Sequence, residues 1–232
     1  MEEKFLELNA KDLELVKQLR INKLTIVLFA LVPFLQVVPS VIYFTSYKQY
    51  ISSVLFIVGA FLVSIIMYKV LLIVLENKNN YFLKLSLVSI LLLLIDQIQK
   101  ALLLISNINL RIIGDYFQIK QIRNYNQNSI LNYLDLGISK EYAILLKICV
   151  IILPIVFFIK TKNSKMKIGL MLLIVASVAS LVDTILRGYV LDSIYYFKLF
   201  CLDIKDYYIQ TAVAIIIAEY FEGEIRKQKD RK

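Results

Sequence analysis

Several residue types that carry common chemistry are absent or rare in this chain of 232 residues. It contains no histidine, no tryptophan, two cysteines, three prolines and six glycines. Without histidine, the chain cannot build a Ser-His-Asp triad, a histidine proton shuttle, or a His-ligated zinc or haem site. Cys149 and Cys201 lack the close spacing of a metal or redox motif, so we interpret them as small apolar residues. We therefore expect no metal and no other cofactor.

The chain is instead rich in hydrophobic residues, which make up 59% of it and give a mean hydropathy of +0.70. A soluble domain of this size is much less apolar. Several runs of about 20 residues are nearly free of charge, which is the length that a transmembrane helix needs. We predict an all-α polytopic membrane protein with about six transmembrane helices, at roughly 24–45, 52–76, 84–105, 141–160, 167–187 and 206–222.

We attribute the net charge of +9 mostly to basic residues that set the orientation of the protein in the membrane. With these spans, about twice as many lysines and arginines flank the side that holds both termini as flank the other side, and the positive-inside rule makes that side cytoplasmic. Basic residues there also attract anionic phospholipid, so we expect a membrane partner and no nucleic acid. Residues 1–23 mix charged and apolar residues, as in an amphipathic helix on the cytoplasmic membrane surface.

The longest outer loop, 106–140, predicts a small extracytoplasmic β element. Its stretch "DYFQIKQI" (115–122) alternates like a half-buried strand, and "RNYNQNS" after it is typical of a polar turn.

Four aspartates collect near the outer ends of the last two spans. Asp183 lies 16 residues after the start of the fifth span, near the outer edge of the membrane, and Asp192 follows in the outer connection. Asp203 and Asp206 open the sixth span, where aspartate also serves as a helix N-cap. Across this tight connection we expect Asp192 and Asp206 to converge. Two carboxylates at one point share a proton and so provide a general acid and a general base.

The third span contains a second polar group, Asp96 and Lys100. They are four residues apart and so lie on one helical face, where they can pair. A structural ion pair between helices is the simpler interpretation, and a polar path through a small transporter or channel is the alternative.

Four stretches between about residues 84 and 222 occur in the order of one known family's motifs. "IDQIQK" is similar to D-Q-x-x-K, and "NQNSILNYL" is similar to N-x-G-A-A-F-x-F-L with Asn126 at its Asn, although a frame that starts at Asn124 matches nearly as well. "SLVDTILRGYVLD" resembles G-N-x-x-D-R-x-x-x-G-x-V-x-D, and "LDIKDYYIQ" resembles F-N-x-A-D-S-x-I. Together they resemble signal peptidase II, the prolipoprotein signal peptidase, an integral-membrane aspartyl protease.

This resemblance implies that Asp192 and Asp206 form a catalytic dyad. In the family, such a pair activates a water that attacks the peptide bond before a diacylglyceryl-modified cysteine, at the outer face of the bacterial cytoplasmic membrane. The resemblance also implies that lipid-modified prolipoproteins are the substrates and that the outer β element, here 109–135, covers the site. It further implies that Asp183 supports the dyad and that Asn126 positions the substrate. Asp96 and Lys100 would form an ion pair that stabilises the helix bundle.

The chain departs from the family pattern at four positions. Ser180 and Thr184 stand where the family has Asn and Arg, and Arg187 lies one helical turn past Thr184, where it can compensate in part. Asp203 and Lys205 stand where the family has Asn and Ala. If the Lys205 ammonium points inward, it lowers the pKa of the aspartate that follows it; alternatively it points to water. We expect Ser180, Asp203 and Arg187 to support the site.

These observations predict three parts of the chain: a cytoplasmic amphipathic segment (1–23), an extra transmembrane hairpin (24–80) and a four-helix core similar to signal peptidase II (81–232). The leading hypothesis is an active endopeptidase. The alternative is a catalytically inactive relative that binds lipoprotein or lipid, suggested by the altered Asn and Arg positions.

Overall fold

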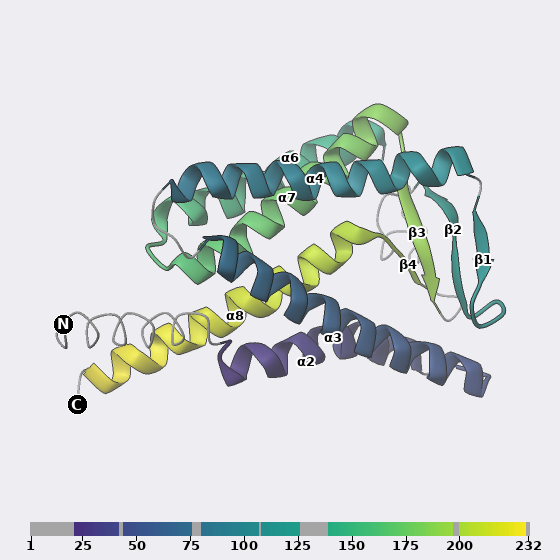
Figure 1. Cartoon of the computed structure of the whole chain (residues 1–232). Helices are drawn as coiled ribbons and strands as arrows, with labels where there is room; N and C mark the ends of the chain where they lie inside the picture. Colours follow the sequence, from purple (N-terminus) through teal and green to yellow (C-terminus); the bar gives the residue numbers. More distant parts are fainter. Residues whose placement is uncertain are drawn as a thin grey trace, which may run out of the picture.

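The computed structural model describes residues 21–41, 44–75, 80–106, 108–125, 139–196 and 200–230. The amphipathic segment expected over residues 1–23 lies outside these ranges except for its last three residues. Long helices run between the two ends of the molecule, and a small sheet lies at one end (Figure 1). The last helix leads away from the sheet, so the C-terminal end of the chain lies at the opposite end (Figure 1).

The helices follow the apolar runs of the sequence closely. They are α2 (Lys23–Val41), α3 (Tyr47–Leu75), α4 (Tyr81–Ser106), α6 (Lys140–Lys160), α7 (Ser164–Arg187) and α8 (Ile204–Asp230). Among the described residues, α3, α4, α6 and α7 are long and apolar enough to cross a membrane, and α2 is apolar over the shorter stretch Lys23–Val38. The predicted class, a mostly helical polytopic membrane protein with a small sheet, is confirmed. That α2 and α8 also cross the membrane stays a prediction.

Helices α7 and α8 pack closely because small residues line their contact. A Cβ atom at Gly169 on α7 would lie 2.9 Å from Ile216 Cγ1 and 3.2 Å from the Ala212 carbonyl oxygen on α8, so only glycine fits there without a shift. Small side chains let membrane helices approach in this way. The fully buried alanines of these two helices are Ala176, Ala179, Ala212, Ala214 and Ala218.

The sheet is antiparallel throughout, in the order β1-β2-β3-β4. Its strands are β1 (Asn109–Arg111), β2 (Phe117–Asn124), β3 (Val190–Tyr196) and β4 (Phe200–Leu202). β2 falls where the alternating pattern predicts a strand. β3 and β4 were not predicted, so Asp192 lies in a central strand and not in an irregular connection. The reason is that β3 is buried over most of its length and lacks a simple alternation of polar and apolar residues.

Helix α3 of the N-terminal hairpin packs against the sheet. The Phe56 ring lies 5.0 Å from the Tyr196 ring on β3, and Tyr196 stacks on Phe117 of β2 at 4.6 Å. The Ser52 hydroxyl donates to the Tyr116 carbonyl oxygen at 2.7 Å, just before β2 begins. The hairpin therefore supports the strands from beneath, in the view of Figure 1.

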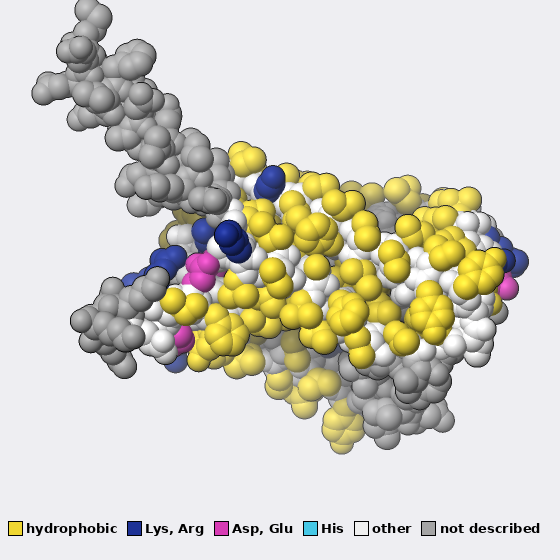
Figure 2. Space-filling view, turned by 90° about the horizontal axis from the view of Figure 1, so that it is seen from below, with side chains coloured by type: hydrophobic (Ala, Val, Ile, Leu, Met, Phe, Trp, Pro, Cys, Tyr) yellow, Lys and Arg dark blue, Asp and Glu magenta, His cyan; other side chains and the backbone are white. Residues whose placement is uncertain are grey.

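The surface has the charge distribution of a membrane protein. Figure 2 shows hydrophobic side chains covering the middle of one face, with charged side chains gathered toward its ends. The exposed apolar residues of the protein include Val58 and Ile66 on α3. A band of this kind matches the hydrocarbon layer, where exposed apolar side chains cost nothing.

Candidate active site

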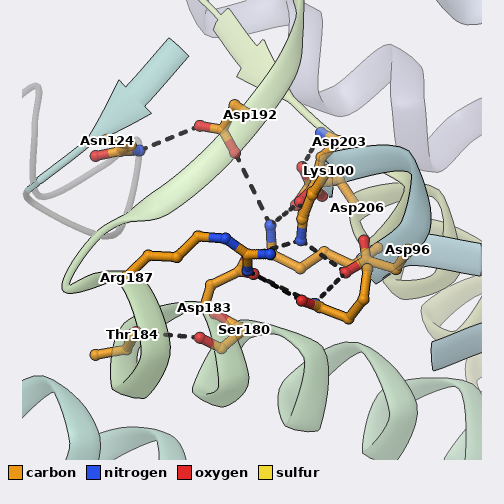
Figure 3. A network of polar contacts seen from close by, with 12 residues as sticks. Asp96, Lys100, Asn124, Ser180, Asp183, Thr184, Arg187, Asp192, Asp203 and Asp206 are labelled. Atoms are coloured by element: carbon orange, nitrogen blue, oxygen red, sulfur yellow. Dashed lines mark hydrogen bonds and ion pairs between the residues drawn. The ribbon is translucent and has the colours of Figure 1, made fainter. Parts of the chain in front are cut away.

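The candidate site lies where the sheet meets the ends of α4, α7 and α8 (Figure 3). Gly188 allows the chain to turn from α7 into the sheet at this point. It ends α7 with φ of 77°, a left-handed conformation that favours glycine, and its N–H donates to the Thr184 carbonyl oxygen. The chain then turns directly into β3, and Asp192 is the third residue of that strand.

Asp192 and Asp206 are brought together, as expected. One carboxylate oxygen from each of Asp192, Asp203 and Asp206 lies within 4.8 Å of the others. Asp192 is only 3% exposed, and Asp206 is half-buried. Two carboxylates at this separation cannot both ionise freely, because their charges repel.

The start of α8 holds Asp206 in place by its backbone. The Asp203 N–H donates to Asp206 Oδ2 at 2.8 Å, and the Asp206 N–H donates to the Asp203 carbonyl oxygen at 3.3 Å. This is the backbone half of a capping box, in which an acidic residue in the first turn accepts from the residue that precedes the helix. The geometry fixes the Asp206 carboxylate at the helix N-terminus, where negative charge is favoured.

Asp192 has two polar neighbours on other elements. Asn124 Nδ2 donates to Asp192 Oδ2 at 3.4 Å, and Lys205 Nζ lies 3.8 Å from Asp192 Oδ1. Asp192 pairs with Ile122 across the strands, so Asn124, two residues further on β2, projects on the same face. Burial raises the pKa of Asp192 to about 6, while Lys205 and the Asn124 amide act in the opposite direction.

The Lys205 side chain points inward, which decides between the two orientations left open by the sequence. It is 5% exposed and forms an ion pair with Asp203. Its second contact is with Asp192 and not with Asp206, the aspartate that directly follows it in the chain.

Lys100 is surrounded by three carboxylates and is fully buried. Its ammonium lies 2.7 Å from Asp96 on α4, 2.7 Å from Asp183 on α7 and 2.8 Å from Asp203 just before α8. Asp96 and Lys100 thus form the ion pair that their spacing predicts, and the ammonium also reaches the residues around the dyad. Breaking such a buried cluster leaves an uncompensated charge, which is strongly destabilising.

Asp183 is a second centre of the same network. Arg187 Nη1 lies 2.6 Å from Asp183 Oδ1 and donates to Gln97 Oε1 at 3.0 Å, and Gln97 Nε2 donates to Asp183 at 3.3 Å. Arg187 therefore binds the carboxylate from one helical turn further along α7. This is where the sequence places a compensating cation for Thr184.

Lys147 on α6 is a polar residue that the sequence reasoning missed. Its ammonium donates to the Ser180 carbonyl oxygen at 3.2 Å and to the Thr184 hydroxyl. A lone lysine inside the apolar run 141–160 was the available signal, because such residues face a polar interior. Ser180 thus takes part through its backbone carbonyl, which also accepts from Thr184 at 3.0 Å.

Asn126 lies outside the described residues, so its place relative to the dyad is not described. The alternative frame of the motif starts at Asn124, and that residue does contact Asp192. Asn124 is 7% exposed, and its Oδ1 has no hydrogen-bond partner among the described residues.

Two groups of carboxylates have the spacing of a metal site, Asp96–Asp183–Asp203 and Asp192–Asp203–Asp206. An ammonium already lies among each of them, that of Lys100 in the first and that of Lys205 in the second. The negative charge of each group is therefore balanced, at least in part, by a lysine of this chain.

Comparisons with known proteins agree with this fold. The sequence profile of the family described as signal peptidase (SPase) II matches residues 88–222. Two solved bacterial membrane enzymes, both determined by the in meso method, share the fold. One, at 2.3 Å resolution, is 20% identical with a TM-score of 0.54 over 62% of this chain and 90% of its own. The other, at 1.9 Å resolution, is 21% identical with a TM-score of 0.51 over 59% of this chain and 91% of its own.

The search of curated proteins returned no match. Helices α2 and α3 precede the region that the family profile matches. Most of α4, the whole sheet, α6, α7 and the part of α8 up to residue 222 fall within it. Because this match covers more than half of the chain, the protein belongs to the signal peptidase II family.

Proposed function

We propose that this protein is a membrane aspartyl endopeptidase that removes signal peptides from diacylglyceryl-modified prolipoproteins at the outer face of the cytoplasmic membrane. The observation that carries the proposal is the pair Asp192 and Asp206, whose carboxylate oxygens lie within 4.8 Å at the sheet end of the apolar helices. Family membership supports the processing of lipoprotein signal peptides in general.

The two carboxylates supply the whole of the acid–base chemistry. One ionised carboxylate removes a proton from water, and the water oxygen attacks the carbonyl carbon of the scissile peptide. The other carboxyl donates its proton to the leaving nitrogen as the C–N bond breaks. The products are a carboxylic acid and an amine, and the dyad carries one proton both before and after the reaction. This chemistry suits a chain without histidine.

The position of the site matches a substrate that is half in the membrane. A signal peptide presents an apolar helix and a lipid-modified cysteine, both of which belong in the hydrocarbon layer. The exposed apolar side chains that cover the helices provide surroundings for them, and phospholipid occupies the remaining surface. The sheet end then faces the outside of the cell, and the C-terminal end of α8 faces the cytoplasm.

One observation favours the alternative of a catalytically inactive binder. The ion pair Asp203–Lys205 is packed against the dyad, and its ammonium lies 3.8 Å from Asp192. In the binder hypothesis this ammonium permanently neutralises Asp192, and the chain still holds lipoprotein or lipid.

Cleavage in vitro separates the two functions. The purified protein in lipid is given a signal-peptide substrate with a diacylglyceryl-modified cysteine and, in parallel, the same peptide with an unmodified cysteine. We expect cleavage directly before the cysteine in the modified peptide alone, measured by mass spectrometry, and its loss when a lipid-peptidase inhibitor is added. Binding of the modified peptide without any cleavage would instead establish the inactive relative.

A further inference from the structure

The buried ion pair Asp203–Lys205 makes the candidate dyad asymmetric. Asp203 is fully buried and Lys205 is 5% exposed, so the pair is shielded from water. The Lys205 ammonium lies 3.8 Å from Asp192 Oδ1. Within the described part of the chain, no ammonium lies at ion-pair distance from Asp206, whose carboxylate accepts from the Asp203 N–H. The helix N-terminus there acts like a positive charge of about one half, which is weaker than the full charge of the ammonium beside Asp192.

The position of the ammonium is set by its partners. Asp203 Oδ2 binds both Lys205 and Lys100, the latter at 2.8 Å, and Lys100 is itself held by two further carboxylates. Lys100 is thus committed to its own cluster, and Lys205 is the ammonium that reaches Asp192. The dashed contacts in Figure 3 show this chain of partners from Asp96 to Asp192.

The charged groups that act on Lys205 come from every neighbouring element. Attractive charges lie on β3 and at the start of α8, and repulsive ones lie on α4 and α6. The attractive charges are Asp192, Asp203 and Asp206, and the repulsive ones are Lys100 and Lys147. Further charges of the same network are Asp96, Asp183 and Arg187. The nearest are carboxylates, so Lys205 remains a cation.

We propose that Lys205 is a positioning residue that polarises the dyad: its ammonium, fixed by Asp203, holds Asp192 as the ionised base and leaves the shared proton on Asp206. This inference rests on the proposed peptidase function. A cation near one of two coupled carboxylates favours ionisation of that one. Lys205 itself neither gains nor loses a proton.

The proton balance of the reaction follows from this assignment. Asp192 takes a proton from the attacking water, and Asp206 gives its proton to the leaving nitrogen. The dyad then carries its proton on Asp192, and passing it back to Asp206 restores the starting state. Lys205 favours that return, because it stabilises Asp192 as an anion.

The test measures how kcat/KM depends on pH. The acid limb of this profile, where kcat/KM falls as the pH is lowered, reports the pKa of the essential base in the free enzyme. In Lys205→Met the cation is lost while the volume is kept, so we expect the limb to move up by about one to three pH units. In Asp203→Asn a nearby negative charge is lost, so the limb moves down. The double variant loses both charges, and its limb lies between those of the two single variants.

A variant that only loosens the structure lowers the rate at all pH values and leaves the limb in place. That result for Lys205→Met would overturn the inference. Lys160→Met, at the exposed end of α6, is the matched control, and its profile should coincide with that of the unaltered protein. If Lys205→Met fails to fold, the double variant is used instead, because its neutral pair restores the charge balance. Its acid limb is then compared with that of Asp203→Asn and should lie at higher pH; coinciding limbs would overturn the inference.

A second readout does not depend on cleavage. Infrared titration follows the carboxylic-acid C=O band, and Asp192→Asn identifies the contribution of Asp192. In Lys205→Met this band should persist to higher pH than in the unaltered protein; an unchanged titration would contradict the inference. If the unaltered protein cleaves no substrate while the band shifts as expected, the proposed function fails and the electrostatic role of Lys205 stands.

Discussion

At the scale of single residues, the site is a dense arrangement of buried charges. Lys100 neutralises three carboxylates, Arg187 binds Asp183, and Lys205 binds Asp203 beside the candidate dyad. Buried charges are costly unless they are paired, so each carboxylate depends on a specific cation. In the proposed enzyme, stability and catalysis are therefore linked through the same side chains.

Replacing Lys100 with methionine leaves three buried carboxylates without their shared cation. We expect a loss of about 3–5 kcal/mol in the free energy of unfolding, since one partner of a buried ion pair is removed. Thermal unfolding in detergent measures this as a lower Tm, with Lys160→Met as the control. An unchanged Tm would show that the carboxylates find other counter-charges.

The ionisation of Asp192 gives a pH dependence of stability with a definite sign. Its pKa is raised to about 6 in the folded protein, above the value of about 3.9 for unfolded aspartate. The folded state therefore binds the proton more tightly, and this contribution to stability is present at low pH and is lost as the pH rises through about 6.

Asp192→Asn should therefore be more stable than the unaltered protein at pH 7, by about 2–3 kcal/mol, because it removes a buried charge. The difference in Tm should shrink as the pH falls toward 4. A variant that is less stable at pH 7 would mean that Asp192 is a net stabiliser.

At the scale of elements, the helices could be predicted from the sequence, and half of the sheet could not. The apolar runs are long and uninterrupted, so their length alone locates α3, α4, α6 and α7. β2 follows its alternating pattern, whereas β3 is a central strand buried on both faces, for which alternation is a poor guide. The motif spacing placed Asp192 near Asp206. It could not reveal that Lys205 turns toward Asp192, since that depends on tertiary contacts.

The contact between α3 and β3 gives a prediction for the N-terminal hairpin. Phe56 is 2% exposed and packs on Tyr196 of the strand that carries Asp192. Phe56→Ala should cost about 3–5 kcal/mol by leaving a cavity, and should lower Tm correspondingly. Val58→Ala, on the exposed apolar side of the same helix, is the matched control and should change Tm little. Equal effects of both substitutions would argue against a supporting role of the hairpin.

At the scale of the whole molecule, charge and apolar surface define an orientation. The apolar band separates a sheet end, which carries the candidate site, from the end where α8 finishes (Figures 1 and 2). The excess of basic residues at the latter end predicts that it is cytoplasmic. In this proposed orientation, we expect the site to lie at the outer face, where signal peptides emerge.

Cysteine accessibility tests this orientation. With Cys149 and Cys201 replaced by alanine, a cysteine at Arg111, exposed on β1, should react with a membrane-impermeant maleimide in intact cells. A cysteine at Lys162, between α6 and α7, should react only after the membrane is opened. The reverse pattern would invert the topology and place the dyad inside the cell.

The central claim is that Asp192 and Asp206 together cleave the peptide bond. The most direct measurement is the rate of cleavage of a diacylglyceryl-modified signal-peptide substrate by Asp192→Asn, Asp206→Asn and, as the matched control, Asp115→Asn, whose carboxylate is exposed at the sheet edge. We predict that each dyad variant loses cleavage by on the order of 10⁴-fold or more while remaining folded, and that the control retains it. Cleavage at the unaltered rate in either dyad variant would contradict the account.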